Sequence, residues 1–457
     1  MLSVSSRLAG RISKAMGGDE HAGFRAKLIL QNPDAEYRKV ITLVSSVTIV
    51  QDFLHSYMDQ IAVSVQMTPE DYRAMYANST NLEATLMLNP CDLRTRSQVA
   101  DQPPIIFETR VLVDKLQDMD KIANPNLTAD AKSGEAIAPY QHDILMTVDL
   151  QLMDKGCYDT RRVKLNATFT ECDVESVIHW VGGHLGAEKC SVVPPDNKQT
   201  YKNLVVDPFK DISNIFPFLQ ARYGIYSKGL GYYYTDKTLY VYPAYDHDRN
   251  TSTISNICNI VGVTEPSFRG NHVYHNRVED DIWIMSLHNS IDNISQRSSE
   301  NAGNVTMSLN PETSLHKAAK LCGDGVLRRD SSDLTVIQAQ NTKSNTTDKM
   351  LNTNYQVSTS NVYVATSKMA AGDAVMLSSV WDLAMPKSIT PGMHCVYHYD
   401  AHAGDFKVHT GRVLSVVYKG FSLKDTGDTA NPILRFVADI LAHLSPEQQS
   451  DPQTQFK

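Results

Sequence analysis

Residues 221–246 read ARYGIYSKGLGYYYTDKTLYVYPAYD and contain eight of the chain's 21 tyrosines. The stretch predicts a β-hairpin in which Tyr232–Tyr234 and Leu239–Tyr242 form the arms around a four-residue turn, Thr235–Thr238. Tyrosine suits such arms because its ring covers a half-buried pleated surface while its hydroxyl group stays hydrated. Pro243 is expected to end the second arm, since proline has no N–H group to donate to a strand ladder.

Two roles are open to these tyrosines. They could stack on sugars or on single-stranded bases, as aromatic side chains do in nucleic-acid grooves. Base stacking is usually accompanied by interleaved cations, whereas only Arg222, Lys228 and Lys237 lie nearby. Packing between sheet and helix, or at a subunit interface where tyrosine is enriched, is therefore the favoured role. The tyrosines that we predict as interface residues are Tyr232, Tyr234, Tyr240 and Tyr242.

Composition sets the outer bounds. At 457 residues the chain has room for about two or three domains, and its 42% hydrophobic and 21% charged content is typical of globular proteins. A net charge of −8 argues against a nucleic-acid grip driven by bulk electrostatics, which needs a basic face. Seven scattered cysteines without a CxxC pair predict reduced, buried thiols. No apolar run reaches the roughly 18 residues of a membrane helix, so we expect no stable membrane insertion.

The first 23 residues are predicted to form a basic N-terminal arm. Arg7, Arg11 and Lys14 all precede the first acidic residue, Asp19. This composition fits a mitochondrial transit peptide and also fits an amphipathic arm that docks on a neighbouring subunit. We favour the docking arm, with Arg7 and Arg11 as its contact residues.

Residues 24–195 are predicted to form a first β-barrel-like domain of short antiparallel strands. Thr68 and Pro69 indicate one short helix among the strands, and a second helix is expected from an N-cap at Thr170 to Gly182 and Gly183. The expected strands are Ala26–Leu30, Val40–Val50, Ile61–Met67, Leu82–Leu88, Ile105–Leu116 and Ile144–Met153.

Residues 196–290 are predicted to form an α/β middle domain around the tyrosine-rich hairpin. A helix is expected to begin near Ser213 and Asn214 and to end at Gly224, which supplies the left-handed residue after the helix. Residues 291–355 are rich in Asn, Ser and Thr, which predicts long loops around one short helix, Pro311–Leu321.

Residues 356–443 are predicted to form a C-terminal β domain, followed by a flexible tail at residues 444–457. Its expected strands are Ser360–Ala365, Ala374–Leu377 and a long hairpin made of Gly392–Asp400 and Phe406–Tyr418, with Gly411 as a candidate bulge. Residues 432–443 are expected to be helical.

The long hairpin also carries the best metal candidates, which are His394, His398, His402 and His409 together with Asp400. Even spacing puts His394 and His398 on one face of a strand, and the turn and return strand could add the other two histidines. The alternative is a sheet face that carries histidines without binding metal, and we favour it. Asp246–Asp248 and Glu279–Asp281 are interpreted in the same way, as charged turns rather than cation sites. We therefore expect no metal and no other cofactor.

Common catalytic motifs are missing from the sequence, which contains no GxSxG, HExxH, Walker A or GxGxxG pattern. We therefore expect no enzymatic activity. The less favoured alternative is an enzyme, either a metal-dependent hydrolase that uses the histidines between His394 and His409 or a cell-wall-degrading tail enzyme.

Two segments resemble baseplate hub proteins of contractile-tailed bacteriophages. One runs from Asn214 to Tyr245, with NIFPFLQARYGIY followed by a glycine-containing turn and the aromatic LYVYPAYD. The other is the late hairpin GMHCVYHYDAHAGDFKVHTGRVLSVVYKG. The fold that this resemblance supports is α+β but mainly β, with two barrel-like antiparallel β domains, an α/β middle segment and long loops.

The resemblance implies a structural virion protein in the tail baseplate, assembled in the cytoplasm of the bacterial host. Such a hub is a homo-trimer whose two barrel-like domains per subunit form a pseudo-sixfold ring between the tail tube and the central spike. Wedge and tape-measure proteins would be further partners, and DNA would meet the hub only in transit through its channel. No catalytic residue carries over. The runner-up is another oligomeric tail protein or a head–tail connector.

Overall fold

The structure is a computed structural model of the chain, and the part of the chain that it describes is mainly β. The described residues are 22–93, 95–99, 102–112, 145–160, 164–206, 214–248, 256–262, 275–278, 281–286, 288–293, 304–309, 320–321, 327–328, 336–341, 361–372, 374–402, 405–422 and 432–446.

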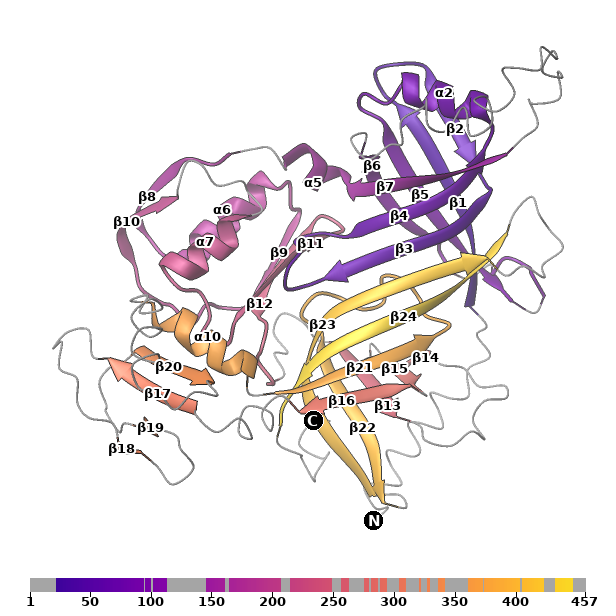
Figure 1. Ribbon diagram of the computed structural model, residues 1–457. Coiled ribbons are helices and arrows are strands. Elements are labelled where there is room, and N and C mark those ends of the chain that lie inside the picture. The colour runs from indigo at the N-terminus through magenta and orange to yellow at the C-terminus, as the bar shows by residue number, and fades with distance from the viewer. Residues whose placement is uncertain are drawn as a thin grey trace, which may run out of the picture.

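Two long strands, β23 (Asp405–Ser422) and β24 (Ile433–Leu444), run side by side through the middle of a 15-stranded sheet (Figure 1). Their antiparallel ladder extends from the pair Gly411 and Leu444 to the pair Ser422 and Leu434. The rest of the large sheet is attached to the outer edges of these two strands, so β23 and β24 connect its N-terminal and C-terminal parts.

Strands from the N-terminal part close a ring with β23 and β24. Eight strands take part, and each pairs with the next in the order β1, β5, β6, β7, β4, β3, β23 and β24. The last of them, β24, pairs with β1 and so closes the ring. We call this the first ring. Its remaining strands are β1 (Ala22–Asn32), β3 (Val44–Asp52), β4 (Gln60–Met67), β5 (Glu83–Asp92), β6 (Ile105–Val111) and β7 (Met146–Asp154), and β2 (Tyr37–Ile41) pairs with β1 outside the ring.

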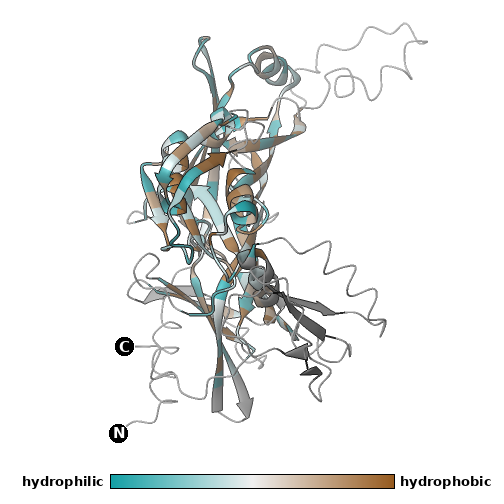
Figure 2. Ribbon diagram, turned by 90° about the vertical axis from the view of Figure 1, so that its left-hand side faces the viewer, coloured by the Kyte–Doolittle hydropathy of each residue, from teal (hydrophilic) through white to brown (hydrophobic). Residues whose placement is uncertain are grey.

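Alternating hydropathy explains these strands, and it is visible along the ribbon in Figure 2. On β4, Ile61, Val63 and Val65 are buried while the residues between them are more exposed. Every second side chain of a strand points to the same face, so these residues form one face of the apolar core. Helix α2 (Pro69–Ala77) follows β4, with the Thr68 hydroxyl group accepting the N–H group of Asp71.

The C-terminal strands attach to the same two long strands further along. β22 (His394–His402) pairs with the first part of β23, and β21 (Val375–Asp382) pairs with the last part of β24. We call them, with their neighbours, the second strand set. The neighbours are β13 (Ile257–Gly262), β14 (His275–Val278), β15 (Asp281–Ser286) and β16 (Asn289–Asn293).

A β-bulge marks the place where β23 changes neighbours. Its residues up to Arg412 pair with β22, and its residues from Ser415 onward pair with β3. The register with β24 shifts between Val413 and Ser415, and the carbonyl group of Leu414 accepts the N–H group of Phe53. Bulges bend and twist a strand, which here lets one strand serve both halves of the sheet.

The tyrosine-rich segment belongs to a smaller α/β unit beside the first ring (Figure 1). None of the described helices is long and apolar enough to span a membrane. The elements of this unit are α5 (Lys155–Thr160), β8 (Ala167–Cys172), α6 (Val174–His184), β9 (Lys189–Val192), β10 (Tyr201–Val206), α7 (Ile215–Arg222), β11 (Leu230–Thr235) and β12 (Thr238–Pro243).

Between β16 and helix α10 (Val362–Gly372) the structure describes only short strands. The predicted helix Pro311–Leu321 lies outside the described residues except for Lys320 and Leu321, which form a strand. The short strands between β16 and α10 are β17 (Asn304–Leu309), β18 (Lys320–Leu321), β19 (Leu327–Arg328) and β20 (Val336–Asn341).

Two predictions of secondary-structure type were wrong, and the predicted strand Val40–Val50 is divided between β2, which ends at Ile41, and β3, which begins at Val44. Residues 432–443 form strand β24 rather than a helix, because long-range pairing buries Leu434, Phe436 and every second residue after them. Ser360–Ala365 was predicted as a strand, but its described residues lead into and form helix α10. Here Asn361 accepts the N–H group of Tyr363 and donates to carbonyl groups at the end of α7.

Two local details also differ from expectation. Helix α6 is capped by Asp173, whose carboxylate accepts the N–H group of Ser176 at 2.8 Å, rather than by Thr170. It also continues through Gly182 and Gly183 and ends at His184. Gly411 does not form the bulge. A Cβ atom at this position would lie 2.0 Å from the carbonyl oxygen of His443, so glycine is needed for close approach of β23 and β24.

The close approach of β23 and β24 at Gly411 leads to a stability prediction. Gly411→Ala is expected to destabilise the fold by about 3 kcal/mol or more, because the strand ladder must move to admit the methyl group. Gly183→Ala in α6 is the matched control, since nothing lies within 4 Å of its added Cβ atom and alanine is the better helix former. Thermal unfolding followed by circular dichroism measures both. A Gly411→Ala protein that melts with the wild type would contradict this account of the ladder.

Candidate functional site

The tyrosine hairpin, β11 with β12, docks against the loop between β3 and β4 of the first ring. Its turn residues Asp236 and Lys237 both have positive φ angles, 47° and 58°, as a two-residue type I′ turn requires. The N–H group of Tyr234 donates to the carbonyl group of Tyr57 at 2.7 Å, and the ring of Tyr233 packs edge-on against Phe53 at 4.9 Å. The hairpin is therefore joined to the ring by backbone pairing as well as by side chains.

A buried carboxylate, Asp59, lies at the centre of this contact. Its Oδ1 atom accepts from Gln51 Nε2 at 2.8 Å and from the Tyr233 hydroxyl group at 2.9 Å. Its Oδ2 atom accepts from the Thr235 hydroxyl group at 3.2 Å. Burial raises the pKa of Asp59, whereas the hydrogen bonds from Gln51 and Tyr233 act in the opposite direction. A buried acid with three donors is a strong and specific joint between two elements.

A buried arginine holds the other end of the tyrosine segment. Arg412 of β23 is 1% exposed and donates to the carbonyl groups of Asp246 at 2.9 Å, Gly392 at 2.7 Å and Asp248 at 3.2 Å. Lys228 lies 2.5 Å from the Asp246 carboxylate and 3.3 Å from that of Asp248. The acidic turn at Asp246–Asp248 therefore binds the chain's own cations.

Two histidines extend this second contact. His443 of β24 is directly opposite Arg412 in the ladder and is 1% exposed. Its Nε2 atom donates to the carbonyl group of Ala371 at 3.4 Å, so its Nδ1 atom accepts from His247 Nε2 at 3.1 Å. Burial lowers the pKa of His443 to about 4, and His247 adds to that effect. The neutral ring matches this environment, because a positive charge would lie beside Arg412.

The structure places most of the predicted interface tyrosines inside the chain. Tyr232, Tyr234 and Tyr242 are 8%, 3% and 2% exposed, so their rings pack within this subunit instead of facing a partner. Tyr240 is half-buried, and its role at a subunit interface stays a prediction. Arg7 and Arg11 lie outside the described residues.

The predicted histidine cluster is spread over two faces of the sheet. His394 and His398 share one face, about 13 Å apart along the strand, whereas the register puts His409 on the other face. His398 donates from Nε2 to Asn259 at 3.1 Å and stacks on Trp283, and burial lowers its pKa to about 4. For His402 only the backbone, at the end of β22, is described. Among the residues that the structure describes, there is no group of three or more His, Cys, Asp or Glu side chains that could hold a metal ion.

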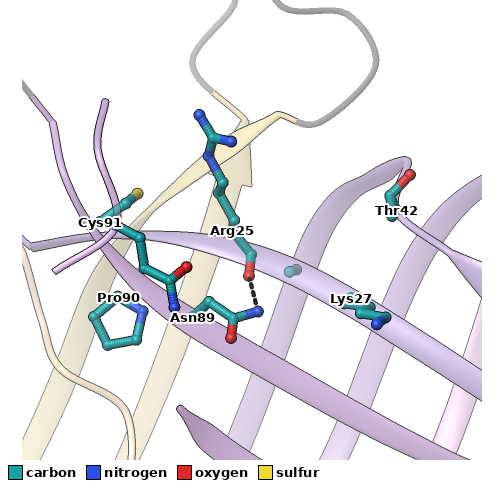
Figure 3. Close-up of a pocket in the computed structure, with 8 residues that line it drawn as sticks. Arg25, Lys27, Thr42, Asn89, Pro90 and Cys91 are labelled. Carbon is teal, nitrogen blue, oxygen red and sulfur yellow. Dashed lines mark hydrogen bonds between the residues drawn. The ribbon is translucent and has the colours of Figure 1, made fainter. Parts of the chain in front are cut away.

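A separate cleft opens beside β1 and β5. It has a volume of about 240 Å³ and is lined by residues that include Arg25, Lys27, Asn89 and Cys91. Figure 3 shows Asn89 directed at the backbone of β1, where its Nδ2 atom donates to the carbonyl group of Arg25 at 3.3 Å, while the Arg25 side chain points away from Lys27. The two cations do not converge, so the cleft does not form a site for a single anion.

Sequence reasoning missed Asp59, Arg412 and His443. A lone acid between two strands and a lone arginine within a strand give no motif. Their importance comes from burial, which only the assembled sheet creates. The one available signal is a charged residue within a predicted strand, such as Arg412 before Val413.

The Asp59 joint gives a testable prediction. Asp59→Ala is expected to destabilise the protein by about 2–4 kcal/mol, because buried donors on Gln51 and Tyr233 lose their acceptor. Asp59→Asn keeps an acceptor oxygen and should lose much less. Urea unfolding measures the difference. Equal effects of the two substitutions would show that hydrogen bonding to this side chain is unimportant.

The His443 contact predicts loss of stability in acid. The pKa is about 4 when folded and about 6.5 when unfolded, so the unfolded chain binds more protons in this interval. Stability from this group is therefore complete above about pH 6.5 and falls as the pH drops towards 4, by about 2 kcal/mol at pH 5.

The test compares the pH dependence of urea unfolding in the wild type and in His443→Gln, which lacks a titratable ring. Using the difference between the two proteins is necessary because the raised pKa of Asp59 acts in the opposite direction. His55→Gln is the control, since the His55 side chain is 81% exposed. Identical pH profiles for the wild type and His443→Gln would rule out this contribution.

Comparison with known proteins gives one family and several distant structures. The family described as Bacteriophage PBS1 gene 109 protein matches residues 21–367. No curated protein matches the chain. The solved structures similar to this chain at low identity include three examples. They are a tail protein from Neisseria meningitidis MC58 (10% identity, TM-score 0.43, 92% of this chain and 96% of that chain), the 43 kDa tail protein of prophage MuSo2 from Shewanella oneidensis (8%, 0.43, 92% and 98%) and a Francisella PdpA–VgrG complex (9%, 0.45, 96% and 62%).

TM-scores in this range do not establish a shared fold, so the assignment rests on the match to residues 21–367. Because that match covers most of the length of this chain, the chain belongs to the Bacteriophage PBS1 gene 109 protein family.

Proposed function

We propose that this chain is a structural component of the virion, a baseplate hub that joins the tail tube to the central spike and surrounds the DNA-ejection channel. Membership of a bacteriophage protein family supports a role in the virion. The observation that carries the hub proposal is the arrangement of two strand assemblies along one shared pair, β23 and β24.

The first ring is closed by strand pairing, and the second strand set nearly returns on itself. β13, β22, β23, β24 and β21 pair in that order, and β21 pairs with β16. β16 follows closely after β15, which pairs with β13. The Ser286 hydroxyl group donates to the carbonyl group of Val380 at 2.8 Å, and the N–H group of Val380 donates to His288 at 3.0 Å. We infer from these contacts that the second set is also barrel-like.

Two barrel-like units per chain suit a symmetry adaptor. Three copies would present six similar units to a sixfold tail tube while keeping threefold symmetry for a spike. The joints at Asp59 and Arg412 would keep the α/β unit in a fixed position beside the two assemblies. In this proposal the N-terminal arm with Arg7 and Arg11, and the half-buried Tyr240, contact neighbouring subunits or the tube, wedge and tape-measure proteins.

The charge of the chain agrees with a channel through which DNA passes. A net charge of −8 gives no overall attraction for phosphates, so DNA could slide past without being held. A channel protein of this kind needs no catalytic group, and the buried positions of His398 and His409 fit structural roles.

The proposal is tested by the mass of the purified protein and by its position in the virion. Light scattering coupled to size-exclusion chromatography should give three times the 50.9 kDa of one chain. Gold-labelled antibody should bind at the end of the tail far from the head. A monomer at high concentration, or label at the head–tail junction, would overturn the hub assignment, and the second result would favour a connector.

A further inference from the structure

Two cysteines from distant parts of the sequence lie directly opposite each other in the second strand set. β13 and β22 pair in parallel, and Cys258 is the register partner of Cys395. Both residues are fully buried and belong to the main hydrophobic core. Neighbouring strands lie about 4.8 Å apart, which falls within the Cα separation of about 4.4–6.8 Å found across disulfides.

The other described cysteines lack such a partner. Cys172 is opposite Tyr201, Cys190 is opposite Leu239, and Cys91 is opposite Gly23. Cys157 lies in helix α5 and is buried. Among the cysteines that the structure describes, only Cys258 and Cys395 are therefore register partners of each other. Both are present as free thiols.

The surroundings make the pair slow to react with oxidants. A hydrogen bond with the Cys258 thiol, together with burial, raises the pKa of Cys395 well above its usual range. Since the thiolate is the reactive form, little of it is present near neutral pH. The pair would therefore react with an oxidant much more slowly than an exposed cysteine.

We propose that Cys258 and Cys395 form a latent disulfide site, which closes when the protein meets a small oxidant of the peroxide class. One thiolate attacks hydrogen peroxide, giving a sulfenic acid and releasing hydroxide, which takes up the thiol proton as water. The second thiol then attacks the sulfenic sulfur, and the S–S bond forms as a second water leaves. The two sulfurs together lose two electrons, and the peroxide gains them.

Closure would join β13 covalently to β22 inside the second strand set. The bond would enclose the chain from residue 258 to residue 395, a long loop whose closure restricts the unfolded chain strongly. The reduced protein already has the two strands in register, so the bond fixes an existing arrangement. This inference does not depend on the hub proposal, since it concerns one subunit only.

The experiment uses the purified full-length protein, reduced and then freed of reductant. Hydrogen peroxide is added at neutral and at alkaline pH, and the protein is then denatured with an alkylating agent and digested without reduction. Mass spectrometry should find a peptide pair linked through Cys258 and Cys395, forming faster at alkaline pH and disappearing with dithiothreitol. The melting temperature should rise by on the order of 5 °C.

The less buried Cys172 and Cys190 report that the oxidant has acted. If they are oxidised while Cys258 and Cys395 are recovered alkylated or as unlinked sulfinic acids, the proposal is overturned. Cys258→Ser should lose both the linked peptide and the rise in melting temperature, and Cys157→Ser should keep both. Because the linked peptide is sought in the wild type, the test does not depend on whether either variant folds.

Discussion

The pairing of β23 with β24 is the interaction on which the rest of the structure depends. β24 supplies the pair of residues that closes the first ring onto β1, and β23 carries both β3 and β22. A bulge near Leu414 and a glycine at position 411 allow the two strands to stay in contact while β23 changes neighbours. Without this ladder the first ring would be open and the second strand set would lose its connection to it.

At the two contacts of the tyrosine segment, buried charged groups have a role that differs from the role of the apolar core. Asp59 and Arg412 are both removed from water, which is unfavourable unless every donor and acceptor is satisfied. Each is surrounded by groups from separate parts of the chain, so each contact is favourable only in one arrangement. The apolar core supplies the driving force for folding, and these two polar groups determine how the α/β unit is positioned against the sheet.

Local elements could be predicted from the sequence, whereas the arrangement of strands could not. The tyrosine hairpin with its turn, the helix after Thr68 and the end of α7 before Gly224 follow from turn, capping and glycine preferences that act within a few residues. Residues 432–443 have apolar side chains that also fit a helical repeat, and only pairing with β23 makes them a strand. The same limit explains the histidines. Spacing along one strand correctly placed His394 and His398 on one face, but the cross-strand register that separates His409 depends on the turn.

The ring closure has a consequence for the order in which the protein is made. Phe24 pairs with Leu434, so β1 completes its ladder with a strand that leaves the ribosome much later. Until β23 and β24 emerge, β3 and the start of β1 keep an unsatisfied edge of N–H and C=O groups, which is a template for association with other chains. Such distant contacts also slow folding, because the closure of a very long loop must precede any gain from the ladder. A nascent chain of this protein therefore depends on β23 and β24, residues 405–444, to cover these edges of β1 and β3.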